Sequence, residues 1–167
     1  MDTEEITYTL NSRLLKLLDS DMIRFGSDEL KALRGKIGVY SIWKNAEVIY
    51  VGKTIRQDLK IRITEILADF RTHSLNKKLL LEMLLAKYGD KLKEKDVELR
   101  KRFDTEELKA FIAKEIFTEQ EFSGLKADLR EEIKSKLMIK CLPLEEPQEV
   151  TSLEHFAIAI LKPKYND

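Results

Sequence analysis

The chain has few of the residues that cross-link or break a polypeptide. Its 167 residues include one cysteine, three prolines and six glycines. A single cysteine, Cys141, excludes an internal disulfide framework and fits a reducing compartment, so we expect a cytoplasmic protein. The small number of glycines and prolines predicts that long loops are rare. No apolar run approaches the roughly 18 residues of a membrane span, so no membrane partner is expected.

An excess of either charge is also absent, because thirty Lys and Arg residues balance thirty Asp and Glu residues. As a sum, this balance speaks against a general nucleic-acid binder, which usually carries a basic excess. The distribution is uneven: residues 51–78 hold seven basic and three acidic side chains, whereas residues 103–132 hold four and nine. The chain is therefore polarised, and any recognition of nucleic acid is expected to be restricted rather than indiscriminate.

Hydrophobic spacing predicts a small α+β fold. Residues 36–52 are rich in β-branched and aromatic side chains on both sides of Lys44-Asn45, which is typical of a β-hairpin. Residues 137–144 predict a third strand, which Pro143 ends or places at the edge of the sheet. Helical spacing predicts short helical turns before residue 34 and longer helices over 59–70, 74–88, 104–117, 124–136 and 150–161. We expect a three-stranded antiparallel sheet flanked by helices.

The predicted organisation is an N-terminal helical extension, residues 1–34, followed by one domain, residues 35–167. A highly charged helical segment at about 91–135 interrupts this domain as an insertion. Its first part is basic, with six basic and three acidic side chains in residues 91–102. The insertion is interpreted either as an elaboration that contacts DNA or a protein partner, or as a solvated helical hairpin. A homodimer is left open as well.

Four groups of residues suggest chemistry. Gly38-Val39-Tyr40 lies on the first hairpin strand, and Tyr50-Val51-Gly52-Lys53-Thr54 lies on the second. Arg62 lies on the next helix, where a guanidinium suits bidentate recognition of phosphate. Glu154 lies in the last helix, which leads into Pro163-Lys164-Tyr165-Asn166. Taken singly, each group also has a structural interpretation, such as a cross-strand aromatic pair or a glutamate that favours a helix N-terminus.

Taken together and in this order, the four groups resemble the GIY-YIG nuclease family. The resemblance covers roughly residues 36–89 and 136–167, with the two tripeptides Gly38-Val39-Tyr40 and Tyr50-Val51-Gly52 similar to the family's name motif. It implies a divalent-metal-dependent endonuclease that hydrolyses DNA phosphodiester bonds, of restriction, mobile-element, phage or repair type. The catalytic residues that the resemblance implies are Tyr40, Tyr50, Arg62 and Glu154.

The resemblance also implies a set of binding residues. Glu154 would hold Mg²⁺ or Mn²⁺, and a phenol whose pKa is lowered by the metal and basic neighbours would accept a proton from water. The substrate-binding residues implied are Gly52, Lys53, His73 and Asn166. One position departs from the family, which commonly has Tyr or His four residues after the arginine, where this chain has Ile66. The alternative is therefore a catalytically weak or inactive GIY-YIG-like DNA-binding module.

The two tyrosines line one site only if the hairpin puts them on the same face of the sheet. A two-residue loop at Lys44-Asn45 would pair Tyr40 with Ile49 and turn the tyrosines to opposite faces. A three-residue loop that also includes Ala46 would pair Tyr40 with Tyr50 directly, with Asn45 in the left-handed conformation. Because the resemblance places both tyrosines in the site, we predict the three-residue loop.

Overall fold

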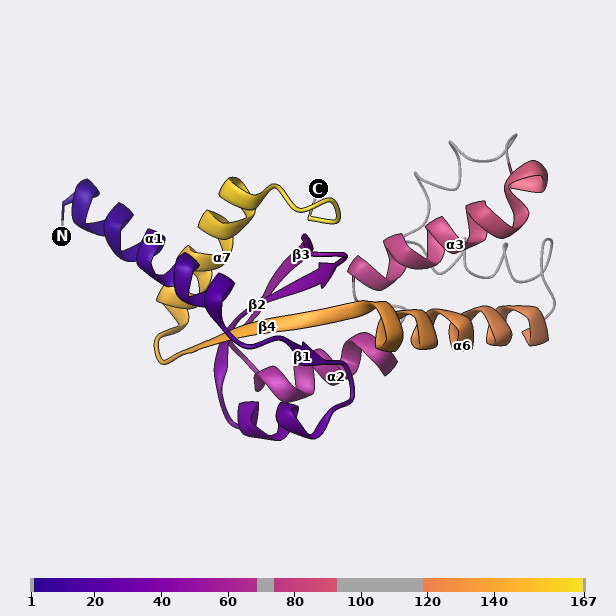
Figure 1. The fold of residues 1–167 in the computed structure, drawn as a ribbon, viewed down its shortest axis with the longest axis horizontal. Coiled ribbons are helices and arrows are strands. Elements are labelled where there is room, and N and C mark those ends of the chain that lie inside the picture. The colour runs from indigo at the N-terminus through magenta and orange to yellow at the C-terminus, as the bar shows by residue number, and fades with distance from the viewer. Residues whose placement is uncertain (1, 69–73, 93–118, 167) are drawn as a thin grey trace. The chain divides into compact units, whose positions relative to one another are not determined.

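The structure is a computed structural model that describes residues 2–68, 74–92 and 119–166 (Figure 1). The chain forms two compact units, residues 1–68 with 133–167 and residues 69–132. The elements, in chain order, are α1 (Thr3–Asp19), β1 (Ile23–Arg24), the 3₁₀ helix η1 (Asp28–Leu33), β2 (Ile37–Lys44), β3 (Glu47–Thr54), α2 (Leu59–Ala68), α3 (Ser74–Leu92), α6 (Glu119–Lys136), β4 (Leu137–Leu144) and α7 (Pro147–Leu161).

The first unit is built on an antiparallel sheet whose strand order, within the described residues, is β1-β4-β2-β3. The expected α+β class, with an antiparallel sheet flanked by helices, is confirmed, but the expected number of three strands is wrong. The fourth strand is the two-residue β1, in which Ile23 pairs with Ile139 and Arg24 pairs with Met138 of β4. A strand of this length shows no alternation that a sequence pattern can detect.

Helices cover both faces of this sheet (Figure 1). Because successive strand residues point to opposite faces, Val39 and Val51 face one way and Tyr40 and Tyr50 face the other. On the first face, α1 and α7 pack on the strands through a core of Leu14, Leu17, Val39, Val51, Val150, Leu153 and Ala157. On the other face, α2 contacts β2, β3 and η1.

The segment expected as an N-terminal extension contributes α1, β1 and η1 to this first unit. Asp2 caps α1 by accepting a hydrogen bond from the Glu5 N–H at 2.8 Å. The helix therefore begins well before the leucines whose spacing predicted only short helical turns. An ion pair of 2.6 Å between Arg13 and Glu149 then joins α1 to α7. In the part of the chain that the structure describes, no helix is long and apolar enough to cross a membrane.

The second unit contains α3 and most of α6. α3 continues past Gly89, where a C-terminal cap was expected, and α6 begins at Glu119 rather than near Gly124. Buried leucines four or five residues apart give both helices an apolar face: Leu75, Leu79, Leu80 and Leu84 in α3, and Leu125 and Leu129 in α6. The helix expected over 104–117 lies outside the described residues.

Candidate functional site

The hairpin of β2 and β3 turns through Asn45 and Ala46. Lys44 pairs directly with Glu47, and the two turn residues have φ values of 50° and 65°. Two successive residues with positive φ are the signature of a type I′ turn, whose twist matches that of the strands it joins. The predicted three-residue loop is therefore wrong, because Lys44 belongs to the strand rather than to the loop.

A bulge in the hairpin sets the position of the two tyrosines. The register shifts between Ile42 and Trp43, so Tyr40 pairs with Gly52 and Ile42 pairs with Tyr50. Both tyrosines consequently share one face of the sheet, as expected, but they are diagonal neighbours rather than a directly opposed pair. Their ring centroids lie 6.3 Å apart with an interplanar angle of 38°, a separation at which aromatic rings stabilise each other.

Gly52 makes room for this arrangement. A Cβ atom at this position would lie 2.5 Å from the hydroxyl oxygen of Tyr40 and 2.9 Å from Cε1 of Tyr50. Non-bonded carbon atoms sit at about 3.5–4.0 Å at their best separation, so any side chain here would displace a ring. Gly52 therefore lets the rings of Tyr40 and Tyr50 lie close to the backbone of β3.

Asp58 fixes the start of α2. Its Oδ1 accepts a hydrogen bond from the Ile61 N–H at 2.7 Å, and its Oδ2 accepts one from the Gly35 N–H at 3.1 Å. These two hydrogen bonds favour the ionised carboxylate and hold the pKa of Asp58 below its ordinary value. The cap orients the first turn of α2, which carries Arg62.

Arg62 reaches the tyrosines from α2. Its guanidinium is hydrogen-bonded to the hydroxyl of Tyr40 and also donates to Oε2 of Glu65 at 3.4 Å. Glu65 accepts a second hydrogen bond, from Nε2 of Gln57 at 2.7 Å. Arg56, the other arginine near the hairpin, is exposed. Glu65 was not among the expected site residues, although its spacing of three residues from Arg62 is that of helix neighbours with opposite charge.

Burial changes the acid–base properties of Tyr40, which is completely buried. The loss of solvent raises the pKa of Tyr40 well above its ordinary value, and the neighbouring Tyr50 raises it further. The charge and hydrogen bond of Arg62 lower this pKa, but they do not reverse the shift. For Tyr40, the expected lowering of the phenol pKa is therefore absent in the protein alone, and burial is the reason.

Ile66 lies on the buried side of α2 together with Leu59 and Ile63, and all three are fully buried. The chain thus uses this position for packing, where the resembling family commonly has Tyr or His. A side chain at this position of α2 does not face solvent, which suits isoleucine.

Lys53 and Glu154 form an ion pair between β3 and α7. Lys53 Nζ lies 2.6 Å from Glu154 Oε2, with the two side chains 25% and 15% exposed. His155 Nε2 lies 3.9 Å from the same carboxylate oxygen, but the imidazole is largely exposed. Neither partner of the ion pair was expected to bind the other, because 100 residues separate them in the sequence.

The expected site residues fall into two groups on the two faces of β3. We call Tyr40, Tyr50, Gly52 and Arg62 the tyrosine–arginine group, which lies on the face that α2 covers. Lys53 follows Gly52 and so points to the opposite face, where its partner Glu154 lies on α7. β3 is the outermost strand of the described sheet, so both groups adjoin one sheet edge.

The two groups influence each other electrostatically. After burial and Tyr50, the charge of Glu154 is a further cause that raises the pKa of Tyr40. A bound group that neutralised Glu154 would therefore ease ionisation of the phenol. The sheet edge thus combines one carboxylate, two cationic side chains and two phenols within electrostatic reach of one another.

The chain after α7 covers part of this edge. The Tyr165 N–H donates to the Ile49 carbonyl at 3.0 Å. The Asn166 amide accepts from the Val51 N–H and donates to the Val51 carbonyl, both at 2.7 Å. The amide thus gives Val51 the two hydrogen bonds that a neighbouring strand would give. Asn166 was expected to bind substrate. In the structure its amide holds the edge strand β3.

Some of the expected features lie outside the described residues. His73, expected to bind substrate, is one of them, as is much of the insertion predicted at about 91–135. Among the residues that are described, no three or more His, Cys, Asp or Glu side chains gather as a metal site. A single carboxylate such as Glu154 still fits Mg²⁺, which keeps several waters and is bound through one or two carboxylates together with substrate phosphates.

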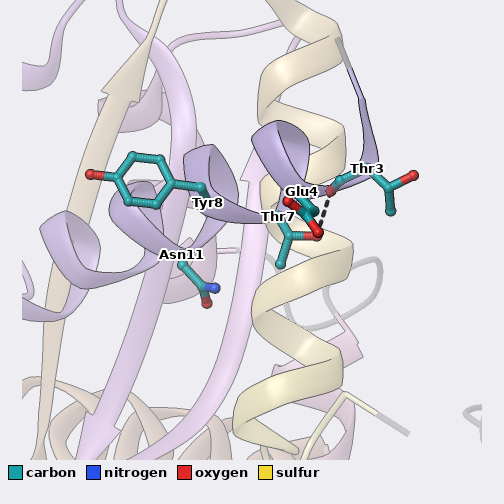
Figure 2. Close-up of a pocket in the computed structure, with 5 residues that line it drawn as sticks. All are labelled: Thr3, Glu4, Thr7, Tyr8 and Asn11. Atoms are coloured by element: carbon teal, nitrogen blue, oxygen red, sulfur yellow. Dashed lines mark hydrogen bonds between the residues drawn. The ribbon is translucent and has the colours of Figure 1, made fainter.

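A hollow of about 360 Å³ lies along α1, away from the residues expected in the site (Figure 2). Thr3, Glu4, Thr7, Tyr8 and Asn11 line it, and the Thr7 hydroxyl donates to the Thr3 carbonyl at 2.8 Å. All five residues belong to one helix, so the hollow is a surface groove between neighbouring side chains rather than an enclosed cavity.

Comparison of the chain with models of protein families, with curated proteins and with solved structures gives no match, so the arrangement at the edge of β3 is what a functional proposal has to rest on.

Proposed function

We propose that this chain is a divalent-metal-dependent DNA endonuclease whose site resembles that of the GIY-YIG family. The observation that carries the proposal is the gathering of Tyr40, Tyr50, Lys53, Arg62 and Glu154 at one sheet edge from four elements, β2, β3, α2 and α7. In this proposal the protein acts in the cytoplasm, and its partner is DNA.

In the proposed reaction, Arg62 and Lys53 bind the phosphate. The hydrogen bonds of Arg62 to Tyr40 and Glu65 hold its guanidinium in one orientation, which limits the entropy lost when it binds an anion. Lys53 adds a point charge from the other face of β3. Together they offset the negative charge that grows on the phosphoryl oxygens as water attacks.

We assign acceptance of the proton from the attacking water to Tyr50, which can take it only as the phenolate. Tyr40 is completely buried, its pKa is raised and its hydroxyl is bonded to Arg62, so its role is to orient the arginine. Tyr50 retains 8% exposure and so has some contact with solvent. A general base must lie within hydrogen-bond reach of its water, which favours the more accessible ring.

Glu154 is the residue that would hold Mg²⁺ or Mn²⁺. When bound there, a divalent cation supplies Lewis-acid stabilisation to the scissile phosphate and to the departing 3′ oxygen. The Glu154 side chain retains 15% exposure, and its helix is anchored by the buried Val150, Leu153 and Ala157. The resemblance implies 5′-phosphate and 3′-hydroxyl products.

Exchange of Glu154 for an uncharged group of the same shape tests the proposal. Supercoiled plasmid is incubated with Mg²⁺ or Mn²⁺ and with wild type, Glu154→Gln or the control Glu145→Gln, whose glutamate is exposed just before α7. We expect nicking by wild type and by the control, and its loss in Glu154→Gln. A Glu154→Gln variant that cuts as fast as wild type contradicts the assignment of the metal ligand.

A second candidate function is a DNA-binding module with weak or absent cleavage. The buried Ile66 favours it, because this position cannot transfer a proton to or from a substrate. Supercoiled, linear and branched DNA, each with Mg²⁺ or Mn²⁺, separate the two candidates. Retarded migration of DNA without nicking supports the binding module, and nicking at catalytic protein concentration supports the endonuclease.

A further inference from the structure

The ion pair of Lys53 and Glu154 bears on how a cation would reach the site. Its atoms lie 2.6 Å apart, and both side chains are mostly removed from solvent. A carboxylate with so little access to water needs a positive partner, and Lys53 is one such partner. The ammonium approaches Oε2, an oxygen that a divalent cation would also use as a ligand.

A cation and the Lys53 ammonium therefore compete for Glu154. Charges of like sign at about 4 Å repel strongly where water is partly excluded, so a divalent cation and the ammonium are not held side by side without an added anion. Lysine has a long, flexible stem, and its head can move to a new partner while the backbone of β3 stays in place. A DNA phosphate at the edge of β3 is such a partner.

We propose that Lys53 is an exchangeable counter-ion of Glu154, which couples binding of the divalent cation to binding of the substrate phosphate. Without DNA, the lysine occupies the carboxylate and keeps the affinity of Glu154 for the cation low. With DNA, the phosphate takes the ammonium, and Glu154 becomes free for the cation. The inference rests on the proposed function, in which Glu154 holds the cation and Lys53 binds the phosphate.

The coupling follows from charge balance at the edge. The ion pair is neutral, and adding a divalent cation alone leaves an excess of two positive charges, which a phosphodiester reduces by one. By linkage, DNA raises the affinity for the cation by the same factor as the cation raises the affinity for DNA. Lys53 is therefore a positioning residue for the cation as well as a phosphate contact.

A titration with Mn²⁺ alone tests the inference in the full chain, without DNA and without turnover. The electron paramagnetic resonance signal of free Mn²⁺ reports binding to wild type, Lys53→Met and Lys36→Met, in which the exposed Lys36 serves as the control. We expect Lys53→Met to bind Mn²⁺ roughly 10- to 100-fold more tightly than wild type, a gain of the same size as the losses that follow when supporting partners of metal ligands are removed. Lys36→Met should equal wild type.

A double variant and two further substitutions complete the test. Adding Glu154→Gln to Lys53→Met should remove the gained binding, Lys53→Gln should repeat the gain, and Lys53→Arg should stay as weak as wild type. Circular dichroism serves to check that each variant is folded. Equal Mn²⁺ affinity in wild type, Lys53→Met and Lys53→Gln, or a gain that survives Glu154→Gln, overturns the inference.

These results are independent of cleavage. If no DNA is cut by wild type but Lys53→Met gains Mn²⁺ binding through Glu154, the counter-ion inference holds and the proposed activity fails. If wild type cuts DNA and Lys53→Met shows no gain, the activity holds and the inference fails.

Discussion

At the scale of single residues, Cys141 shows how burial changes a titratable group. Its side chain lies in β4 and is buried, and desolvation raises the pKa of the thiol to about 12. An unfolded chain exposes the same thiol with its ordinary pKa of 9.0. Above pH 9 the unfolded state therefore loses a proton that the folded state keeps, and stability falls as the pH rises.

We predict that this loss is smaller in Cys141→Ala. Between pH 9 and 10, the wild-type free energy of unfolding should fall by up to about 1.4 kcal/mol more than that of the variant, the value of one proton per pH unit. Urea unfolding at pH 7, 9 and 10 measures it. Above pH 10, Tyr40 adds a similar loss in both proteins, because burial also raises the pKa of Tyr40. Equal pH slopes for the two proteins would contradict the prediction.

Gly52 is, with Gly38, one of two hairpin glycines at which an added Cβ would overlap neighbouring atoms. We predict that Gly52→Ala lowers the free energy of unfolding by about 1–3 kcal/mol, the usual cost of overpacking, because its Cβ would overlap Tyr40 and Tyr50. Chemical denaturation measures the change. The control is Gly124→Ala in α6, where a Cβ meets nothing within 4 Å and should stabilise by about 0.5–1 kcal/mol. A Gly52→Ala protein as stable as wild type would show that the rings can move at little cost.

At the scale of elements, the edge of β3 is held by the chain that follows α7. The Asn166 amide bonds both backbone groups of Val51. We predict that Asn166→Ala speeds hydrogen exchange of the Val51 amide and costs about 1–2 kcal/mol of stability for the two lost bonds. Asn11→Ala, at an exposed position of α1, is the control and should leave exchange at Val51 unchanged.

The result can separate two roles of Asn166. If exchange at Val51 is unchanged in Asn166→Ala, the amide does not hold the edge strand in solution, and the expected role in substrate binding becomes the better explanation. If exchange quickens while the affinity for DNA is kept, Asn166 acts through the strand.

The elements differ in how well the sequence predicts them. β4 was predicted with its observed bounds, because a short, mostly apolar run between a helical pattern and a turn signal is a local feature of the sequence. The register of the hairpin was not predicted, because the bulge at Ile42 and Trp43 depends on packing across strands. β1 and the contact of Asn166 with Val51 join segments more than 100 residues apart, and one sequence holds no signal for such pairs.

The same limit applies to the candidate site. The sequence nominated Tyr40, Tyr50, Arg62 and Glu154, and the structure brings the first three into one group. The ion pair of Glu154 with Lys53 could not be predicted, because it depends on how α7 crosses the strands. Strand alternation does predict opposite faces for Gly52 and Lys53, although the two residues are neighbours in the sequence.

At the scale of the whole molecule, the first unit is assembled from both ends of the described chain. Residues 1–68 and 133–167 supply its strands and its core, and both groups of site residues belong to it. We predict that a chain in which a flexible Gly/Ser linker replaces residues 69–132 unfolds cooperatively on heating. A thermal scan by circular dichroism, together with slow alkylation of the buried Cys141, tests it.

The shortened chain also locates the determinants of DNA recognition. If it folds and retains the DNA affinity of the full chain, the site residues and their unit suffice for binding. If it folds and loses affinity, residues 69–132 contribute the contacts. A chain that fails to fold would contradict the independence of the first unit.

The turn and bulge of the hairpin also restrict how this chain can vary. Tyr40 and Tyr50 share a face because the bulge adds one residue to a two-residue turn. Strand faces alternate with each residue, so the number of residues between the two tyrosines must keep its parity if both rings are to stay on one face. A single insertion or deletion between the tyrosines sends one ring to the wrong side of the sheet, whereas a change of two residues preserves the phase. Natural variation in this loop should therefore come in steps of two.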